Sequence, residues 1–213
     1  KFAGAFAKAP IVEAVVEAEA VVETEVVVEA EVKPLPAASD EVYLIFTDGS
    51  RTGSVCEETR KKGDGAWAWY NENTKEFEAK YVADTTNQRT EMEAIIQAMR
   101  YYATRTNAKL VIHSDSAYSL GGINWRDGWV KRGWTNAKGK AVKNKDLWIE
   151  FFEEYDRLEA VGRIEFVKVK GHVKEMKSNP KGYVYYEGND IVDQYANSHS
   201  LGKLHTWNLR DRD

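Results

Sequence analysis

The stretch IFTDGS, residues 45–50, decides the fold, because a strand-forming run meets an acidic residue and a glycine there. Residues 42–47 are aliphatic, aromatic or β-branched, and such residues favour a buried strand. Asp48 follows this strand directly. Neighbouring strand ends form the ligand-binding crevice of an α/β sheet, so Asp48 is a candidate functional residue. The alternative is that an Asp before a Gly only caps a turn.

Predicted strands and helices succeed one another from residue 41 to the end of the last helix. Strands are predicted at 42–47, 66–70, 77–83, 109–113 and 163–168, and helices at 91–102, 116–120, 146–158 and 190–199. The order is β-β-β-α-β-α-α-β-α. It predicts an α/β fold with a mixed five-stranded sheet, in which three antiparallel strands are followed by two parallel strands and helices flank the faces.

The first 40 residues have a different composition from the rest. Residues 11–33 are almost entirely Val, Ala and Glu, and residues 1–40 hold three lysines against eight acidic residues, a net charge of −5. We expect residues 1–40 to be an acidic, poorly ordered linker or tail, residues 41–202 to be the folded domain, and residues 203–213 to be a C-terminal tail. The alternative, that residues 11–33 pack as an ordinary element, stays open.

Cysteine content and hydrophobicity bear on the compartment. Cys56 is the single cysteine, so an internal disulfide is impossible, which fits a reducing compartment. No apolar run approaches the roughly 20 residues that span a bilayer. We therefore expect a cytoplasmic monomer without a membrane partner. The chain does not begin with Met, so a fragment of a longer protein is an alternative.

Four acidic residues are predicted to meet at one edge of the sheet. Asp48 and Asp115 follow two strands, Glu91 opens the helix at 91–102, and Asp193 lies in the last helix. Two carboxylates ~4 Å apart repel by about 4 kcal/mol at an effective dielectric constant of 20. A hard divalent cation removes this cost, and Mg²⁺ prefers oxygen ligands. The pattern therefore favours a metal site built from acids that are far apart in the sequence.

Seven short motifs follow one another along the chain, namely IFTDGS (45–50), TTNQRTEMEAI (85–95), HSDSAY (113–118), WVKRGW (129–134), VKNKDLW (142–148), VKGH (169–172) and GNDIVDQYA (188–196). Together they resemble the motifs of one family, type 1 ribonuclease H, which cuts the RNA strand of RNA–DNA hybrids. Each motif alone is weak, but the ordered set over residues 42–200 is specific. The resemblance implies the ribonuclease H-like fold and an RNA–DNA hybrid as partner.

The resemblance also implies catalytic roles for five residues. Asp48, Glu91, Asp115 and Asp193 would hold two Mg²⁺ ions, for which Mn²⁺ could substitute, and His172 would assist proton transfer or product release. Hydrolysis would leave a 3′-OH and a 5′-phosphate.

One catalytic assignment has an alternative in the sequence. Asp190 lies three residues before Asp193 on the same helix face, so it is the alternative to Asp193 or a supporting residue.

Substrate contacts are also implied by the resemblance. The matching positions are Gly49, Ser50, Thr86, Asn87, Gln88, Trp125, Lys131 and Arg132. Asn87 or Thr90 could instead be the N-cap of the helix that carries Glu91. Residues 124–145 hold seven basic residues and one acidic residue, a net charge of +6, which suits phosphate binding. The alternative for this segment is a solvated helix whose tryptophans pack inward.

Some features depart from the family pattern, and other functions stay open. Ala117 stands where the family often has a longer polar side chain, and the loops at 50–65 and 172–193 are long. The alternatives to a hybrid-specific nuclease are an inert hybrid-binding module, a transposase or integrase of the same fold, and a piece of a larger polyprotein such as a reverse transcriptase.

Overall fold

A single sheet of five strands, in the order β3-β2-β1-β4-β5, organises the computed structural model, which describes residues 34–51, 63–171 and 183–200. β1 pairs antiparallel with β2, and β2 with β3, whereas β1 pairs parallel with β4, and β4 with β5. The predicted fold class is therefore confirmed. The elements are β1 (Val42–Arg51), β2 (Gly63–Asn71), β3 (Phe77–Thr85), α1 (Asn87–Ala103), β4 (Lys109–Ser114), α2 (Ala117–Lys131), α3 (Lys145–Glu159), β5 (Ile164–Lys168) and α4 (Tyr183–Ser200).

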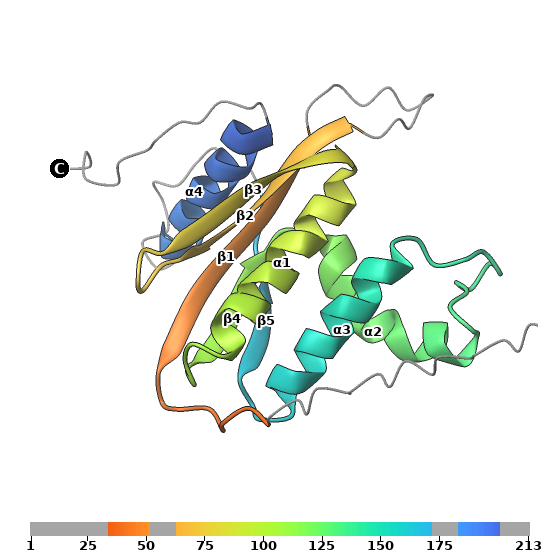
Figure 1. Ribbon diagram of the computed structural model, residues 1–213, viewed down its shortest axis with the longest axis horizontal. Coiled ribbons are helices and arrows are strands. Elements are labelled where there is room, and N and C mark those ends of the chain that lie inside the picture. Colours follow the sequence, from red (N-terminus) through yellow and green to blue (C-terminus); the bar gives the residue numbers. More distant parts are fainter. Residues whose placement is uncertain (1–33, 52–62, 172–182, 201–213) are drawn as a thin grey trace, which may run out of the picture. The chain divides into compact units, whose positions relative to one another are not determined.

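Helices cover the two faces of the sheet unequally. α1 lies on one face with α3 packed against it, and α4 lies on the other face over β1 and β2 (Figure 1). The larger core joins the first face to α1 and α3 and includes Ile45, Ile95 and Trp148, all fully buried. The smaller core joins Phe46 to Val192 on α4. Successive β1 residues thus face opposite helices, as the two-residue period of a strand requires.

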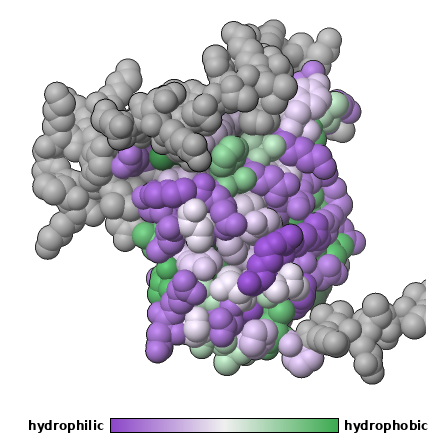
Figure 2. Space-filling model, turned by 60° about the vertical axis from the view of Figure 1, so that its left-hand side comes forward, coloured by the Kyte–Doolittle hydropathy of each residue, from purple (hydrophilic) through white to green (hydrophobic). Residues whose placement is uncertain are grey.

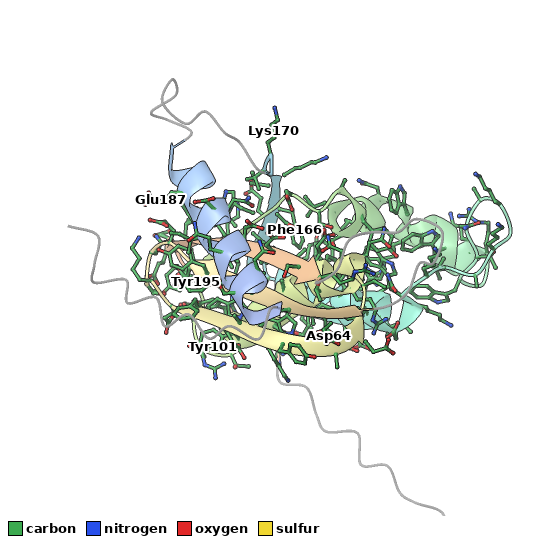
Figure 3. The ribbon with its side chains drawn as sticks, turned by 90° about the horizontal axis from the view of Figure 1, so that it is seen from above. Asp64, Tyr101, Phe166, Lys170, Glu187 and Tyr195 are labelled. Atoms are coloured by element: carbon green, nitrogen blue, oxygen red, sulfur yellow. The ribbon has the colours of Figure 1, made fainter. Side chains whose placement is uncertain are left out.

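The aromatic contacts of α4 show how this helix is held on its face. Tyr195 lies on α4, where Figure 3 labels it. Its ring stacks on Phe77 of β3, with ring centroids 4.2 Å apart and an interplanar angle of 2°. Phe77 and Tyr81 nonetheless stay about half exposed on this outer strand. Figure 2 shows one face of the molecule, on which the described surface is mainly hydrophilic, with apolar groups scattered among polar ones.

Two predicted boundaries at the functional edge were wrong. β1 does not end at Thr47 but runs to Arg51, because β2 continues to pair with it after β4 has ended. α1 begins at Asn87, so Glu91 lies in its second turn instead of opening it. The N-cap is Thr86, whose side chain accepts a hydrogen bond from the Arg89 N–H, and neither Asn87 nor Thr90 takes that place.

Two further helices are longer than predicted. α2 was expected at 116–120 but extends to Lys131, although three glycines weaken its helical signal. Gly122 is needed in this helix because the ring of Trp148 packs directly against it. A side chain at this position would overlap the indole. α4 begins at Tyr183, so part of the segment expected to be a long loop is helical.

The residues just before β1 lie against the domain. Leu35 packs on the larger core, Ala38 donates a backbone hydrogen bond to Val161 O at 3.2 Å, and Ser39 donates one to Asn107 O at 2.8 Å. Among the described residues, no helix is long and apolar enough to cross a membrane.

Candidate active site

One pocket of about 200 Å³ lies where β1, α1, α4 and the turn after β4 meet. All four predicted catalytic acids line it, so the structure brings together residues separated by up to 145 positions in the chain. The lining residues are Asp48, Gly49, Ser50, Arg51, Asn87, Glu91, Asp115, Asp193 and Asn197. Arg51 supplies the cationic side chain among them, so acids dominate the charge of the pocket.

Side chains at the end of β1 alternate between the two faces of the sheet, and this alternation decides which of them reach the site. Phe46 packs toward α4, so Asp48 and Ser50, two and four residues later, are on the α4 face as well. Ser50 donates its hydroxyl proton to Ala196 O at 2.8 Å, which ties α4 to β1 beside the pocket. Pairing with β4 stops at Thr47, so the edge of β1 at Asp48 is open toward the turn that carries Asp115.

Gly49 brings α1 to the site on the opposite face of β1. A side chain at this position would overlap the backbone N of Glu91, the backbone C of Thr90 and the Thr90 hydroxyl. Only a glycine therefore permits the early turns of α1 to lie directly on β1. This close approach places Glu91 at the pocket although α1 and α4 cover different faces of the sheet.

Each pocket acid already accepts a hydrogen bond from the protein or lies beside its backbone. The Gly49 N–H donates to Asp48 Oδ1 at 2.7 Å. Asn87 Nδ2 donates to Glu91 Oε1 at 2.7 Å, one helical turn apart. Asp115 lies so close to Gly171, in the segment after β5, that a side chain on Gly171 would overlap its carboxylate.

Within α4, the pocket selects one of the two candidate aspartates. Asp193 lines the pocket, and its Oδ1 accepts a hydrogen bond from Asn197 Nδ2 at 2.8 Å. Asp190 is exposed and does not line the pocket, and its Oδ2 accepts from Gln194 at 2.9 Å. The geometry therefore favours Asp193.

Burial and the repulsion between neighbouring carboxylates raise the pKa values of two of the acids, Asp48 and Glu91. Burial is the main cause that raises the pKa of the Asp48 carboxyl well above its usual value, and the charges of Asp115 and Asp193 raise it further. Burial also raises the pKa of Glu91, although a hydrogen bond from Ser116 opposes that rise. A positive ion in the pocket would reverse this tendency to bind protons.

The side chains of the pocket have the oxygen ligands that a hard divalent cation prefers, because four carboxylates line one small polar pocket. In the arrangement shown, however, no three His, Cys, Asp or Glu side chains within residues 34–51, 63–171 and 183–200 lie close enough together to hold a metal ion. The carboxylates instead accept hydrogen bonds from neighbouring donors. Metal binding therefore requires at least some of these side chains to rotate.

The predicted substrate residues divide into two groups. Gly49, Ser50 and Asn87 line the pocket. Thr86 and Gln88 do not, although they flank Asn87 at the start of α1.

The other three predicted contacts, Trp125, Lys131 and Arg132, lie on α2 and at its C-terminal end, exposed and outside the pocket. α2 starts two residues after Asp115 and its 15 residues span about 22 Å, so it leads away from the acids. Trp129, by contrast, is buried in the larger core, so the inward-packing alternative holds for that residue.

One predicted residue lies outside the described part of the chain, and several pocket residues were missed. His172 falls outside the described residues. Arg51 and Asn197 line the pocket without having been predicted, and Ser116 contacts Glu91. Asn197 could have been found from its spacing of four residues after Asp193 on one helix.

The fold and the pocket together define a ribonuclease H-like α/β protein. The RNase H family model matches residues 40–200, and the chain belongs to the ribonuclease H family, as the motifs predicted. A ribonuclease H from Chlorobaculum parvum is 36% identical over 142 residues, which cover 66% of this chain and 90% of that protein. A ribonuclease H from Acetivibrio thermocellus is 36% identical over 133 residues, covering 60% of this chain and 81% of that protein.

Solved structures of lower identity share the fold. LC9-RNase H1, a type 1 RNase H with the type 2 active-site motif, aligns with a TM-score of 0.57 and 21% identity, covering 79% of this chain and 75% of that one. The solution structure of the PFV RNase H domain aligns with a TM-score of 0.56 and 22% identity, covering 75% of this chain and 94% of that one.

Proposed function

We propose that this protein is an endoribonuclease that hydrolyses the RNA strand of RNA–DNA hybrids with the help of two divalent ions. The observation that carries the proposal is the convergence of four acids, from three elements and one turn, on one pocket in a member of the ribonuclease H family. The raised pKa of Asp48 supports it, because clustered buried carboxyls with perturbed pKa values are typical of functional sites.

The four acids Asp48, Glu91, Asp115 and Asp193 would hold the ions, which we propose to be Mg²⁺ with Mn²⁺ as a substitute. Such ions, when bound, stabilise the attacking and leaving oxygens of a phosphodiester displacement. The family resemblance supports products with a 3′-OH and a 5′-phosphate.

Other residues would bind the hybrid and move protons. Asn87 is exposed at the pocket, where its amide can bind the backbone of the hybrid as well as Glu91. The 2′-OH is the backbone group that distinguishes RNA from DNA, so a polar contact of this kind would provide selectivity. His172 would take part in proton transfer or product release.

The basic segment would bind the hybrid beyond the pocket. Lys131, Arg132 and the exposed indole of Trp125 suit phosphates and sugars along a second strand. α2 starts two residues after Asp115, so we propose that one bound duplex contacts both the acids and these three residues.

We also propose the organisation and setting of the chain. Residues 41–202 would form the catalytic domain, and residues 203–213 a C-terminal tail. Residues 1–40 would be an acidic linker or tail, the end of which, from Leu35 to Ser39, packs on the domain. The protein would act as a monomer in the cytoplasm.

The test is cleavage of an end-labelled RNA–DNA hybrid beside double-stranded RNA and double-stranded DNA, with and without Mg²⁺. The wild type should cut only the RNA strand of the hybrid, and only with the metal. Asp193→Asn should lose about 100-fold or more in kcat, because loss of a metal ligand should cost at least as much as loss of a residue that supports a ligand, which costs about 10- to 100-fold. Cutting of duplex DNA instead would favour a transposase-like or integrase-like activity.

Asp190→Asn is the matched control, because it makes the same chemical change one helical turn away. Asp190 is exposed and outside the pocket. Its replacement should leave cleavage at the wild-type rate. Equal losses of kcat in the two variants would refute the assignment of Asp193 as the catalytic aspartate of α4.

A further inference from the structure

Ser116 lies directly behind the pocket, although it does not line it. It follows Asp115, is 3% exposed and is the N-cap of α2. Its hydroxyl makes three contacts, with Glu91 Oε2 at 2.6 Å, with the Ser119 N–H at 3.1 Å and with the Ser119 hydroxyl at 2.9 Å. The hydrogen bonds of this buried hydroxyl thus all go to one candidate metal ligand and to the first turn of α2, which restricts the roles it can have.

Counting protons determines the direction of each contact. A serine hydroxyl has one proton to donate and two lone pairs to accept with. An ionised Glu91 carboxylate accepts only, so the Ser116 proton goes to Glu91 Oε2. The two lone pairs then accept from the N–H and the hydroxyl of Ser119. The first turn of α2 thus saturates the Ser116 oxygen and leaves Glu91 as the acceptor of its proton.

Glu91 is consequently held from both sides. Asn87 donates to one carboxylate oxygen at 2.7 Å and Ser116 to the other at 2.6 Å. Asn87 is exposed and can exchange Glu91 for a substrate, whereas Ser116 is buried. The Ser119 hydroxyl is the other group that could accept the Ser116 proton, but an ionised Glu91 carboxylate is the stronger acceptor, and Ser119 has a proton of its own to donate. Ser116 is therefore the permanent support of the Glu91 carboxylate.

We propose that Ser116, oriented by Ser119, is a positioning residue that fixes the Glu91 carboxylate for divalent-ion binding. The inference rests on the proposed function, since it concerns the same acids. Residues that support a metal ligand in this way typically change metal affinity by about 10- to 100-fold when they are removed.

A set of three variants separates this role from helix capping. Ser116→Ala removes both the N-cap and the donor to Glu91. Ser116→Gly removes the same donor but keeps most of the capping stability, because glycine is a good N-cap. Ser116→Thr retains a hydroxyl that can serve both purposes. The difference in thermal stability between Ser116→Ala and Ser116→Gly without metal measures the capping contribution, because both variants lack the donor to Glu91.

The main measurement is the Mg²⁺ affinity of each full-length variant by calorimetry, without nucleic acid. We expect the Ala and Gly variants to lose about 10-fold or more in affinity and the Thr variant to regain most of it. With hybrid present, saturating Mg²⁺ should restore kcat in the Gly variant, and KM for the hybrid should stay at the wild-type value.

Two results would overturn the inference. One is wild-type Mg²⁺ affinity in Ser116→Gly, because any loss in Ser116→Ala would then come from capping. The other is a Ser116→Thr variant that folds but regains no Mg²⁺ affinity. Failure of the proposed function gives a different result. A wild type that binds Mg²⁺ with the Ser116 dependence described, but leaves the hybrid uncut, would refute the substrate assignment and keep the role of Ser116.

Discussion

Replacing Gly49 by alanine tests whether the close approach of α1 to β1 positions the site. The added methyl group would overlap backbone atoms of Thr90 and Glu91, which are not the flexible ends of side chains. Ordinary contact begins at 3.4 Å, so the early turns of α1 must retreat from β1. The overlapping atoms lie about 1 Å closer than this contact distance, so we estimate that the early turns of α1 move by roughly 1 Å.

Stability and activity should respond by different amounts to Gly49→Ala. Overpacking of this kind costs about 1–3 kcal/mol in the free energy of unfolding, measured by urea denaturation. A misplacement of about 1 Å at a catalytic group can lower the rate about 100-fold, so cleavage of the labelled hybrid should fall by that order while the protein stays folded.

The matched control for this variant is Gly128→Ala in α2. There the methyl group meets only the guanidinium end of Arg132, at 3.0 Å, which can move aside. The free energy of unfolding should hold or rise by up to about 1 kcal/mol, because alanine is the better helix former. Wild-type turnover by folded Gly49→Ala would refute the reasoning about α1.

Three further predictions concern the pH dependence of stability, the buried arginine and the N-terminal segment. The folded protein binds the Asp48 proton more tightly than the unfolded chain does, so without metal its free energy of unfolding should fall as pH rises from the usual carboxyl pKa through the raised one. Asp48→Asn should show a smaller fall, because of the two pocket acids with pKa values raised by burial only Glu91 then remains. Urea denaturation across that pH range measures the fall, and an equal fall in Asp48→Asn and the wild type would contradict the prediction. Arg163→Met should cost about 3 kcal/mol or more, because the fully buried guanidinium donates to four backbone carbonyls, and an unfolding midpoint equal to that of the wild type would contradict this. Deleting residues 1–33 should leave hybrid cleavage and the melting temperature unchanged. Deleting residues 1–40 should lower stability by about 2 kcal/mol through loss of the Leu35 contact and two hydrogen bonds, and equal melting temperatures for the two truncations would refute that reasoning.

The pattern of apolar residues predicted all the strands and helices but missed several of their ends. The run before Asp48 has strong strand character, whereas the continuation of β1 to Arg51 depends on pairing with β2. The glycines of α2 conceal a helix that is stabilised by packing against Trp148. Element type follows from local side-chain preference, and element length is decided by partners that are distant in the sequence.

The sequence by itself pointed to Asp48, Glu91 and Asp115, to a fourth acid in the last helix, and to the order of elements that carries them. Only the tertiary structure decided that Asp48 and Gly49 serve opposite faces of one strand, that Asp193 and not Asp190 lines the pocket, and that Ser116 supports Glu91. The physical reason is that a carboxylate can be recognised from its motif, but its neighbours are set by which helices pack on which face of the sheet. That packing results from the burial of apolar side chains along the whole domain, which a short motif does not contain.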